Sequence, residues 1–137
     1  MVVIGKTTAP AAGKRRQKGK NMKYTLFIHL YSEALEYDNV DTYIAERGWQ
    51  DWMDTFEDPV KISSILTSIY NLANSTLTDI RTTYGLSRAQ FSRLFLIPLR
   101  TVESWEAQVR QMPTYSKCML AFAIFNEFLW GEPNEED

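Results

Sequence analysis

The sequence predicts an all-α protein, a helical bundle, from three observations. Apolar residues recur at intervals of three and four through most of the chain. Helix start and stop signals, among them Asp58-Pro59 and Gly85, punctuate that pattern. A hydrophobic content of 45% in 137 residues suffices for one compact core, or for two small helical units that share one.

The first patterned segment covers residues 23–37 and is dense in aromatic side chains. Four of its apolar residues have the spacing of one helix face: Tyr24, Phe27, Ile28 and Tyr31. Alternation over residues 26–30 keeps a short strand open as an alternative, but the longer pattern favours a helix.

A short helix and a tryptophan-rich segment are expected next. Asp41 is suited to cap a helix over residues 42–47, and Gly48 is suited to end it. Residues 49–53 then contain two tryptophans and a methionine. These side chains could anchor the core around a short helix or form a surface for a partner, and the core anchor is favoured.

Asp58 followed by Pro59 is a strong signal for the start of a helix that runs to about Leu72. Residues 22–71 carry nine acidic against three basic side chains. We therefore interpret residues 22–72 as an acidic, aromatic-rich helical subdomain that does not face DNA and is a candidate surface for a protein partner.

Charge is unevenly distributed along the chain, although the net charge is only -2. Residues 1–21 hold six basic side chains and no acidic one, so the rest of the chain has nine basic against 17 acidic side chains. We expect residues 1–21 to be a disordered basic tail, either an arm for DNA phosphates or an extension ahead of a natural start at Met22. Residues 131–137 are expected to be an acidic tail.

The most specific pattern lies in residues 77–113. A first helix has its apolar and inward positions at Leu77, Ile80, Arg81 and Tyr84, and Gly85 stops it. Ser87 and Gln90 then form the capping box of a second helix. The apolar face of this second helix is expected to consist of Phe91, Leu94 and Phe95.

A three-residue connection, 96–98, leads to a third helix expected over residues 99–109. Its inward residues are expected to be Val102, Trp105 and Val109. Two helices joined so closely must cross steeply, which leaves the start and outer face of the third helix protruding in a shape that fits a DNA major groove. The residues expected on that outer face are Leu99, Arg100, Thr101, Ser104 and Gln108.

Over about 37 residues, this pattern resembles the helix-turn-helix family of Cro and phage repressors (XRE-type). The resemblance implies a structural ion pair between Arg81 on the first helix and Glu106 on the third. It also implies that the start of the third helix reads DNA bases, through Leu99, Arg100, Thr101 and Ser104. Arg100 is the leading candidate, because a guanidinium can bond both O6 and N7 of guanine.

Phosphate contacts are expected around the second helix and after the third. The resemblance places a phosphate-contacting residue at Arg88, at the start of the second helix, where the helix dipole favours an anion. The other candidates are Gln90, Arg93 and Arg110.

The chain departs from the family at two positions, Leu96 and Gln108, where the family commonly has glycine. At the first of these, glycine is common because the residue there takes a positive φ. Residues 77–113 carry five arginines against three acids.

Residues 114–130 are expected to form a helix that is capped near Thr114 or Ser116 and is apolar on almost every face. We expect it to pack against residues 24–72 and to complete a helix-turn-helix domain over residues 73–130. A homodimer formed through this helix stays open as an additional role.

The leading hypothesis is a sequence-specific regulator of transcription that binds double-stranded DNA and is similar to proteins of phages and mobile elements. The alternative is a protein-binding regulator, an antirepressor or inhibitor with a repressor-like fold. One cysteine and one histidine give no catalytic constellation, metal site or cofactor site to predict. No run of about 20 apolar residues predicts a membrane span, so we expect a cytoplasmic protein without a membrane partner.

Overall fold

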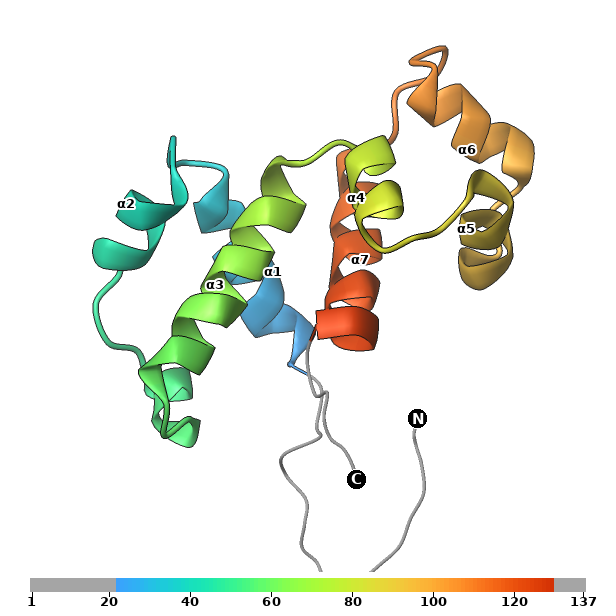
Figure 1. Cartoon of the computed structure of the whole chain (residues 1–137). Helices are drawn as coiled ribbons and strands as arrows, with labels where there is room; N and C mark the ends of the chain where they lie inside the picture. The colour runs from blue at the N-terminus through green and yellow to red at the C-terminus, as the bar shows by residue number, and fades with distance from the viewer. Residues whose placement is uncertain (1–21, 130–137) are drawn as a thin grey trace, which may run out of the picture.

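The structure, a computed structural model, describes residues 22–129, and all its regular elements in this range are helices (Figure 1). The all-α class is therefore confirmed. The basic tail at residues 1–21, Trp130 and the acidic tail at residues 131–137 lie outside the described range. Within that range, no helix is long and apolar enough to cross a membrane.

The first half of the chain forms three α-helices and a short 3-10 helix. Their bounds are α1 Tyr24–Ala34, α2 Val40–Ala45, η2 Asp51–Thr55 and α3 Pro59–Asn74. The strand alternative for residues 26–30 is wrong, because helix α1 covers them. As predicted, the side chain of Asp58 caps α3, accepting a hydrogen bond from the backbone N–H of Val60. Helix α3 continues two residues past the predicted end, through the expected boundary after residue 72.

The expected cap of the second helix is wrong. Asn39 caps α2, since its side-chain oxygen accepts a hydrogen bond from the backbone N–H of Thr42 at 2.9 Å. Asp41 lies in the first turn instead, where a negative charge still suits the helix dipole. The helix ends at Ala45, before the predicted stop at Gly48, which takes a φ of 72°.

The tryptophan-rich segment divides between core and surface. Met53 of η2 is buried and Trp52 is half-buried against Phe56, as a core anchor requires. Trp49, in contrast, is 63% exposed, and its indole N–H donates to a carboxylate oxygen of Asp54 at 2.7 Å. The core-anchor interpretation therefore holds for Trp52 and Met53 only.

Three short helices follow: α4 Leu77–Thr83, α5 Arg88–Phe95 and α6 Leu99–Glu106. After each of them the chain takes a left-handed conformation, at Gly85 with φ 71°, Leu96 with φ 55° and Gln108 with φ 61°. Such a residue ends a helix because it turns the backbone away from the helix axis. Figure 1 shows that α5 and α6 project from the bundle that α1, α3 and α7 form.

Two expectations about these helices are wrong. The third helix does not reach residue 109, because the left-handed Gln108 ends it after Glu106. Val109 therefore lies in the following loop and is 78% exposed instead of inward. Leu94 was expected on the apolar face of α5 but is 47% exposed, since the helix is only eight residues long and buries Phe91 alone.

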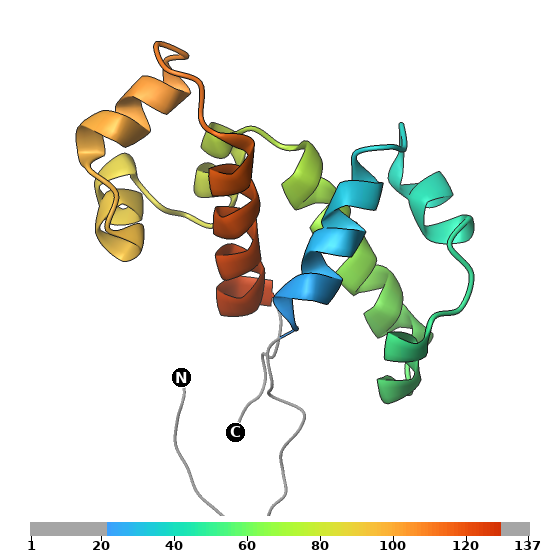
Figure 2. The same cartoon turned by 180° about the vertical axis from the view of Figure 1, so that it is seen from behind.

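The last helix, α7 Thr114–Ile124, continues as a π-helical turn, η3 Phe125–Leu129. Its N-cap is Pro113, not Thr114 or Ser116, and no side chain caps it. The predicted packing against the first half of the chain is confirmed (Figure 2). The ring of Phe27 lies 5.2 Å from that of Phe122 and 5.5 Å from that of Phe125.

Candidate nucleic-acid interface

The candidate interface is built on the start of α5, where the predicted capping box is present. The hydroxyl oxygen of Ser87 accepts from the backbone N–H of Gln90 at 3.1 Å, and the side-chain oxygen of Gln90 accepts from the backbone N–H of Ser87 at 2.8 Å. These bonds satisfy backbone donors that a helix start leaves open. Gln90, a predicted phosphate contact, thus has its carbonyl oxygen engaged in the cap and only its amide N–H groups left to donate.

Helices α5 and α6 are held together by two fully buried apolar side chains, Phe91 and Val102. Trp105 is partly buried beside them, and the rings of Phe91 and Phe95 lie 4.7 Å apart. The connection is closed by Ser92, whose hydroxyl donates to the backbone carbonyl of Ile97. This packing fixes which face of α6 is buried and therefore which face is left to solvent.

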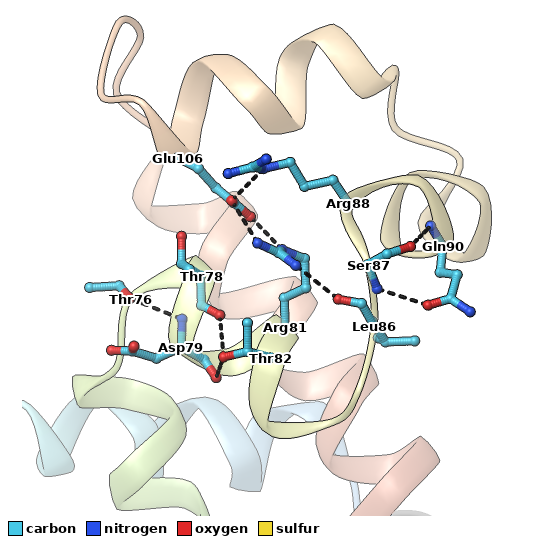
Figure 3. A network of polar contacts seen from close by, with 10 residues as sticks. All are labelled: Thr76, Thr78, Asp79, Arg81, Thr82, Leu86, Ser87, Arg88, Gln90 and Glu106. Atoms are coloured by element: carbon cyan, nitrogen blue, oxygen red, sulfur yellow. Dashed lines mark hydrogen bonds and ion pairs between the residues drawn. The ribbon is translucent and has the colours of Figure 1, made fainter.

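The predicted ion pair between α4 and α6 is present and is bidentate (Figure 3). Arg81 donates from Nε to Oε2 of Glu106 at 2.7 Å and from Nη2 to Oε1 at 3.0 Å. Its Nη1 donates to the backbone carbonyl of Leu86 at 3.0 Å. The side chains of Arg81 and Glu106 are only 11% and 3% exposed. The pair therefore joins α4 and the loop after it to the end of α6, at a place that is almost closed to solvent.

The electrostatics of this pair follow from its geometry. The hydrogen bonds from Arg81 hold the pKa of Glu106 below its ordinary value, against a burial effect that would raise it. The bonds to Glu106 in turn raise the pKa of Arg81, against desolvation. Both groups are therefore charged at neutral pH.

Glu106 also binds a second arginine, which the sequence did not predict. Arg88, at the first position of α5, donates from Nε to Oε1 of Glu106 at 2.9 Å. Its side chain is 53% exposed, in contrast to that of Arg81. The sequence contained only the charges of these residues, and their separation of 18 positions matches no local rule for ion pairs.

The outer face of α6 contains the predicted base-reading residues. Leu99 and Arg100 are exposed at its start, while Thr101 and Ser104 are half-buried. Gln108, also expected on this face, is exposed in the loop beyond the helix. The predicted phosphate contacts Arg93 and Arg110 are exposed as well.

Acidic side chains gather elsewhere. Nine acidic residues lie in residues 33–58, on or between α1, α2, η2 and the start of α3. In Figures 1 and 2, α2 and the pair α5–α6 lie at opposite ends of the molecule. The arginines of α5 and α6 are thus separated from most of the negative charge.

No protein-family model, curated protein or solved structure matches the chain. Among residues 22–129, no group of three histidine, cysteine, aspartate or glutamate side chains is arranged to hold a metal ion. The one cysteine, Cys118, is buried and near the hydroxyl of Tyr24.

Proposed function

We propose that the chain is a sequence-specific regulator of transcription that binds double-stranded DNA, with α5 and α6 as a helix-turn-helix of the phage-repressor type. The observation that carries the proposal is the exposed start of α6, where Leu99 and Arg100 protrude while Val102 is fully buried. A short helix fixed from behind, with a free outer face, has the shape that enters a major groove.

Local geometry supports the assignment to this type of motif. The Arg81–Glu106 ion pair lies where the resemblance places it. Positive φ values occur at Leu96 and Gln108, the two positions where the family commonly has glycine. A left-handed conformation is sterically unfavourable for leucine. It occurs at Leu96 because the turn between two closely joined helices requires it.

The residues of α6 differ in the contacts that their side chains can make with DNA. Arg100 offers two parallel N–H groups to O6 and N7 of guanine, a contact worth roughly 1–3 kcal/mol of discrimination. Leu99 offers apolar contact to a thymine methyl group. Thr101 and Ser104 offer single hydrogen bonds. Arg93 and Arg110 supply charge for phosphates, which adds affinity without sequence preference.

Selection of bound sequences from random duplex DNA tests the proposal. The wild-type chain is expected to enrich one motif, and Arg100→Ala is expected to lose the preference at one base position. Arg93→Ala is the matched control, since loss of a phosphate contact should weaken binding to all sequences about equally. Failure of the wild-type chain to enrich any sequence would contradict the proposal.

A protein-binding regulator is the second candidate, and the exposed Trp49 favours it. Tryptophan is enriched among the residues that dominate protein interfaces. Here its indole N–H donates to Asp54, on the acidic half of the chain. If this half binds a protein, Trp49→Ala should abolish that complex and leave DNA selection unchanged. A complex together with no DNA enrichment would favour the antirepressor or inhibitor hypothesis.

Helix α7 offers a surface for a homodimer. Tyr115 and Met119 lie one helical turn apart and are 70% and 55% exposed. Sedimentation equilibrium of the wild-type chain and of Met119→Lys would test this. A wild-type monomer at all concentrations would remove the dimer from the proposal.

A further inference from the structure

One carboxylate, Glu106, binds two arginines that differ in what they leave free. Arg81 donates from Nε, Nη1 and Nη2, and its side chain is 11% exposed. Arg88 donates to a residue within 22–129 from Nε only, and its side chain is 53% exposed. All three guanidinium nitrogens of Arg81 therefore donate within the protein, whereas Nη1 and Nη2 of Arg88 have no hydrogen-bond partner within residues 22–129.

The bond through Nε fixes how that edge points. A guanidinium is planar, and its Nη1–Nη2 edge faces a different direction from the Nε–H, so a bond from Nε to a buried carboxylate fixes that edge and leaves it free to bind another group. Figure 3 shows Arg88 reaching across from the start of α5 to Glu106, below the ribbon of α6. Because the Glu106 side chain is only 3% exposed, it is itself a rigid support.

Charge around this carboxylate does not balance, since two cations share one anion. The uncompensated positive charge belongs to the exposed member, Arg88. The capping box occupies the backbone N–H groups of Ser87 and Gln90, whereas those of Arg88 and Ala89, at the first two positions of α5, have no partner within residues 22–129. An anion placed here would meet both this edge and these donors.

We propose that Glu106 is a positioning residue for Arg88 and orients its free guanidinium edge to bind one phosphate of the DNA backbone. The inference rests on the proposed function and adds a second role for Glu106 beyond its pair with Arg81. The carboxylate orders a long side chain before DNA arrives, so the contact is made with less loss of side-chain entropy than a free arginine would suffer.

Binding of a mixed-sequence duplex by the full chain, between about 50 and 200 mM salt, tests the inference. Arg88→Ala should reduce the slope of log K against log salt by about 0.9 and weaken binding roughly tenfold. Arg88→Lys should restore the slope, because it restores the charge, but not the affinity, because lysine has neither an Nε bond to Glu106 nor a forked edge.

Arg93 provides the matched control, since it is exposed and has no ion pair with any residue of the described chain. No ion pair within residues 22–129 orients it, so Arg93→Lys should keep the slope and lose less affinity than Arg88→Lys does, whatever Arg93→Ala loses. Equal behaviour of Arg88→Lys and the wild-type chain would refute the positioning role, and so would an unchanged affinity of Arg88→Ala.

The Arg88 Nε–H signal in the NMR spectrum gives a readout that does not depend on affinity. It should be protected from exchange in the free protein and remain so in the DNA complex. Loss of protection on binding would show that Arg88 leaves Glu106, which would overturn the inference. Absence of any DNA binding by the wild-type chain would refute the proposed function and this contact together, whereas full binding by Arg88→Lys would refute only the positioning.

Discussion

Arg81→Ala is expected to be among the most destabilising single changes in the chain. It removes two hydrogen bonds to Glu106, at 2.7 and 3.0 Å, and one to the carbonyl of Leu86. The remaining carboxylate, 3% exposed, cannot recover these bonds from water. Breaking a buried pair in this way typically costs about 3–5 kcal/mol. Arg88 keeps its bond to the same carboxylate, so we expect the lower end, about 3 kcal/mol.

The assay is urea unfolding followed by far-ultraviolet circular dichroism, with linear extrapolation to water. Arg88→Ala is the matched control, because it removes an arginine from the same carboxylate but leaves the buried pair in place. As a half-exposed ion pair, Arg88–Glu106 should contribute at most about 1 kcal/mol. If Arg81→Ala cost no more than Arg88→Ala, the assignment of Arg81 to the fold and of Arg88 to the surface would be refuted.

The effect of Arg81→Ala should also depend on pH. The pKa of Glu106 is lower in the folded protein than its ordinary value of 4.5, chiefly because of the hydrogen bonds from Arg81. The pair therefore contributes its full stability above pH 4.5 and loses it as the pH falls through the folded pKa. The difference in unfolding free energy between wild type and Arg81→Ala should narrow on acidification, and a difference that widened would contradict this.

Five further substitutions test the local geometry, each by the same unfolding measurement. Leu96→Gly should stabilise the protein by about 1 kcal/mol, because the φ of 55° favours glycine and the side chain, 89% exposed, loses no packing, whereas Gly85→Ala should destabilise it by a similar amount. A loss on Leu96→Gly would mean that this leucine makes contacts after all. Ser87→Ala removes the capping box and should cost about 1 kcal/mol, and no change would show that the cap is not needed. Val102→Ala should cost about 1.5–3 kcal/mol and Val109→Ala almost nothing, so equal costs would contradict the observed end of α6.

Local signals in the sequence predicted much of the helical framework. Asp58-Pro59 fixes the start of α3, and Ser87 with Gln90 fixes the start of α5, because each start depends on bonds between residues at most three positions apart. Gly85 likewise marks the end of α4 through its own backbone preference. Short-range chemistry of this kind can be read from the order of residues alone.

Helix ends without glycine were harder to predict. Apolar periodicity extends α6 to Val109, but the left-handed Gln108 ends the helix first, and glutamine gives no intrinsic signal for that conformation. The start of α2 was misplaced for a similar reason, since Asn39 and Asp41 are both good caps and only the turn before the helix decides between them.

The candidate site was predicted in part. The positions of Arg81 and Glu106 followed from the resemblance, not from spacing. The bond from Arg88 to Glu106 could not be predicted, because it depends on how α5 crosses α6 in space. The exposure of Leu94 could not be predicted either, nor could the difference in exposure between Trp49 and Trp52, because tertiary packing alone determines them.

The contact of Phe27 with Phe122 and Phe125 has a consequence for synthesis of the chain on the ribosome. Residues close to a hundred positions apart meet there, so the aromatic face of α1 stays uncovered until the last helix has emerged. The first half of a nascent chain exposes that face, which is the kind of surface that chaperones bind and that promotes aggregation. Chains whose synthesis stops before α7 should therefore be degraded or aggregate, even though their first helices have already been made.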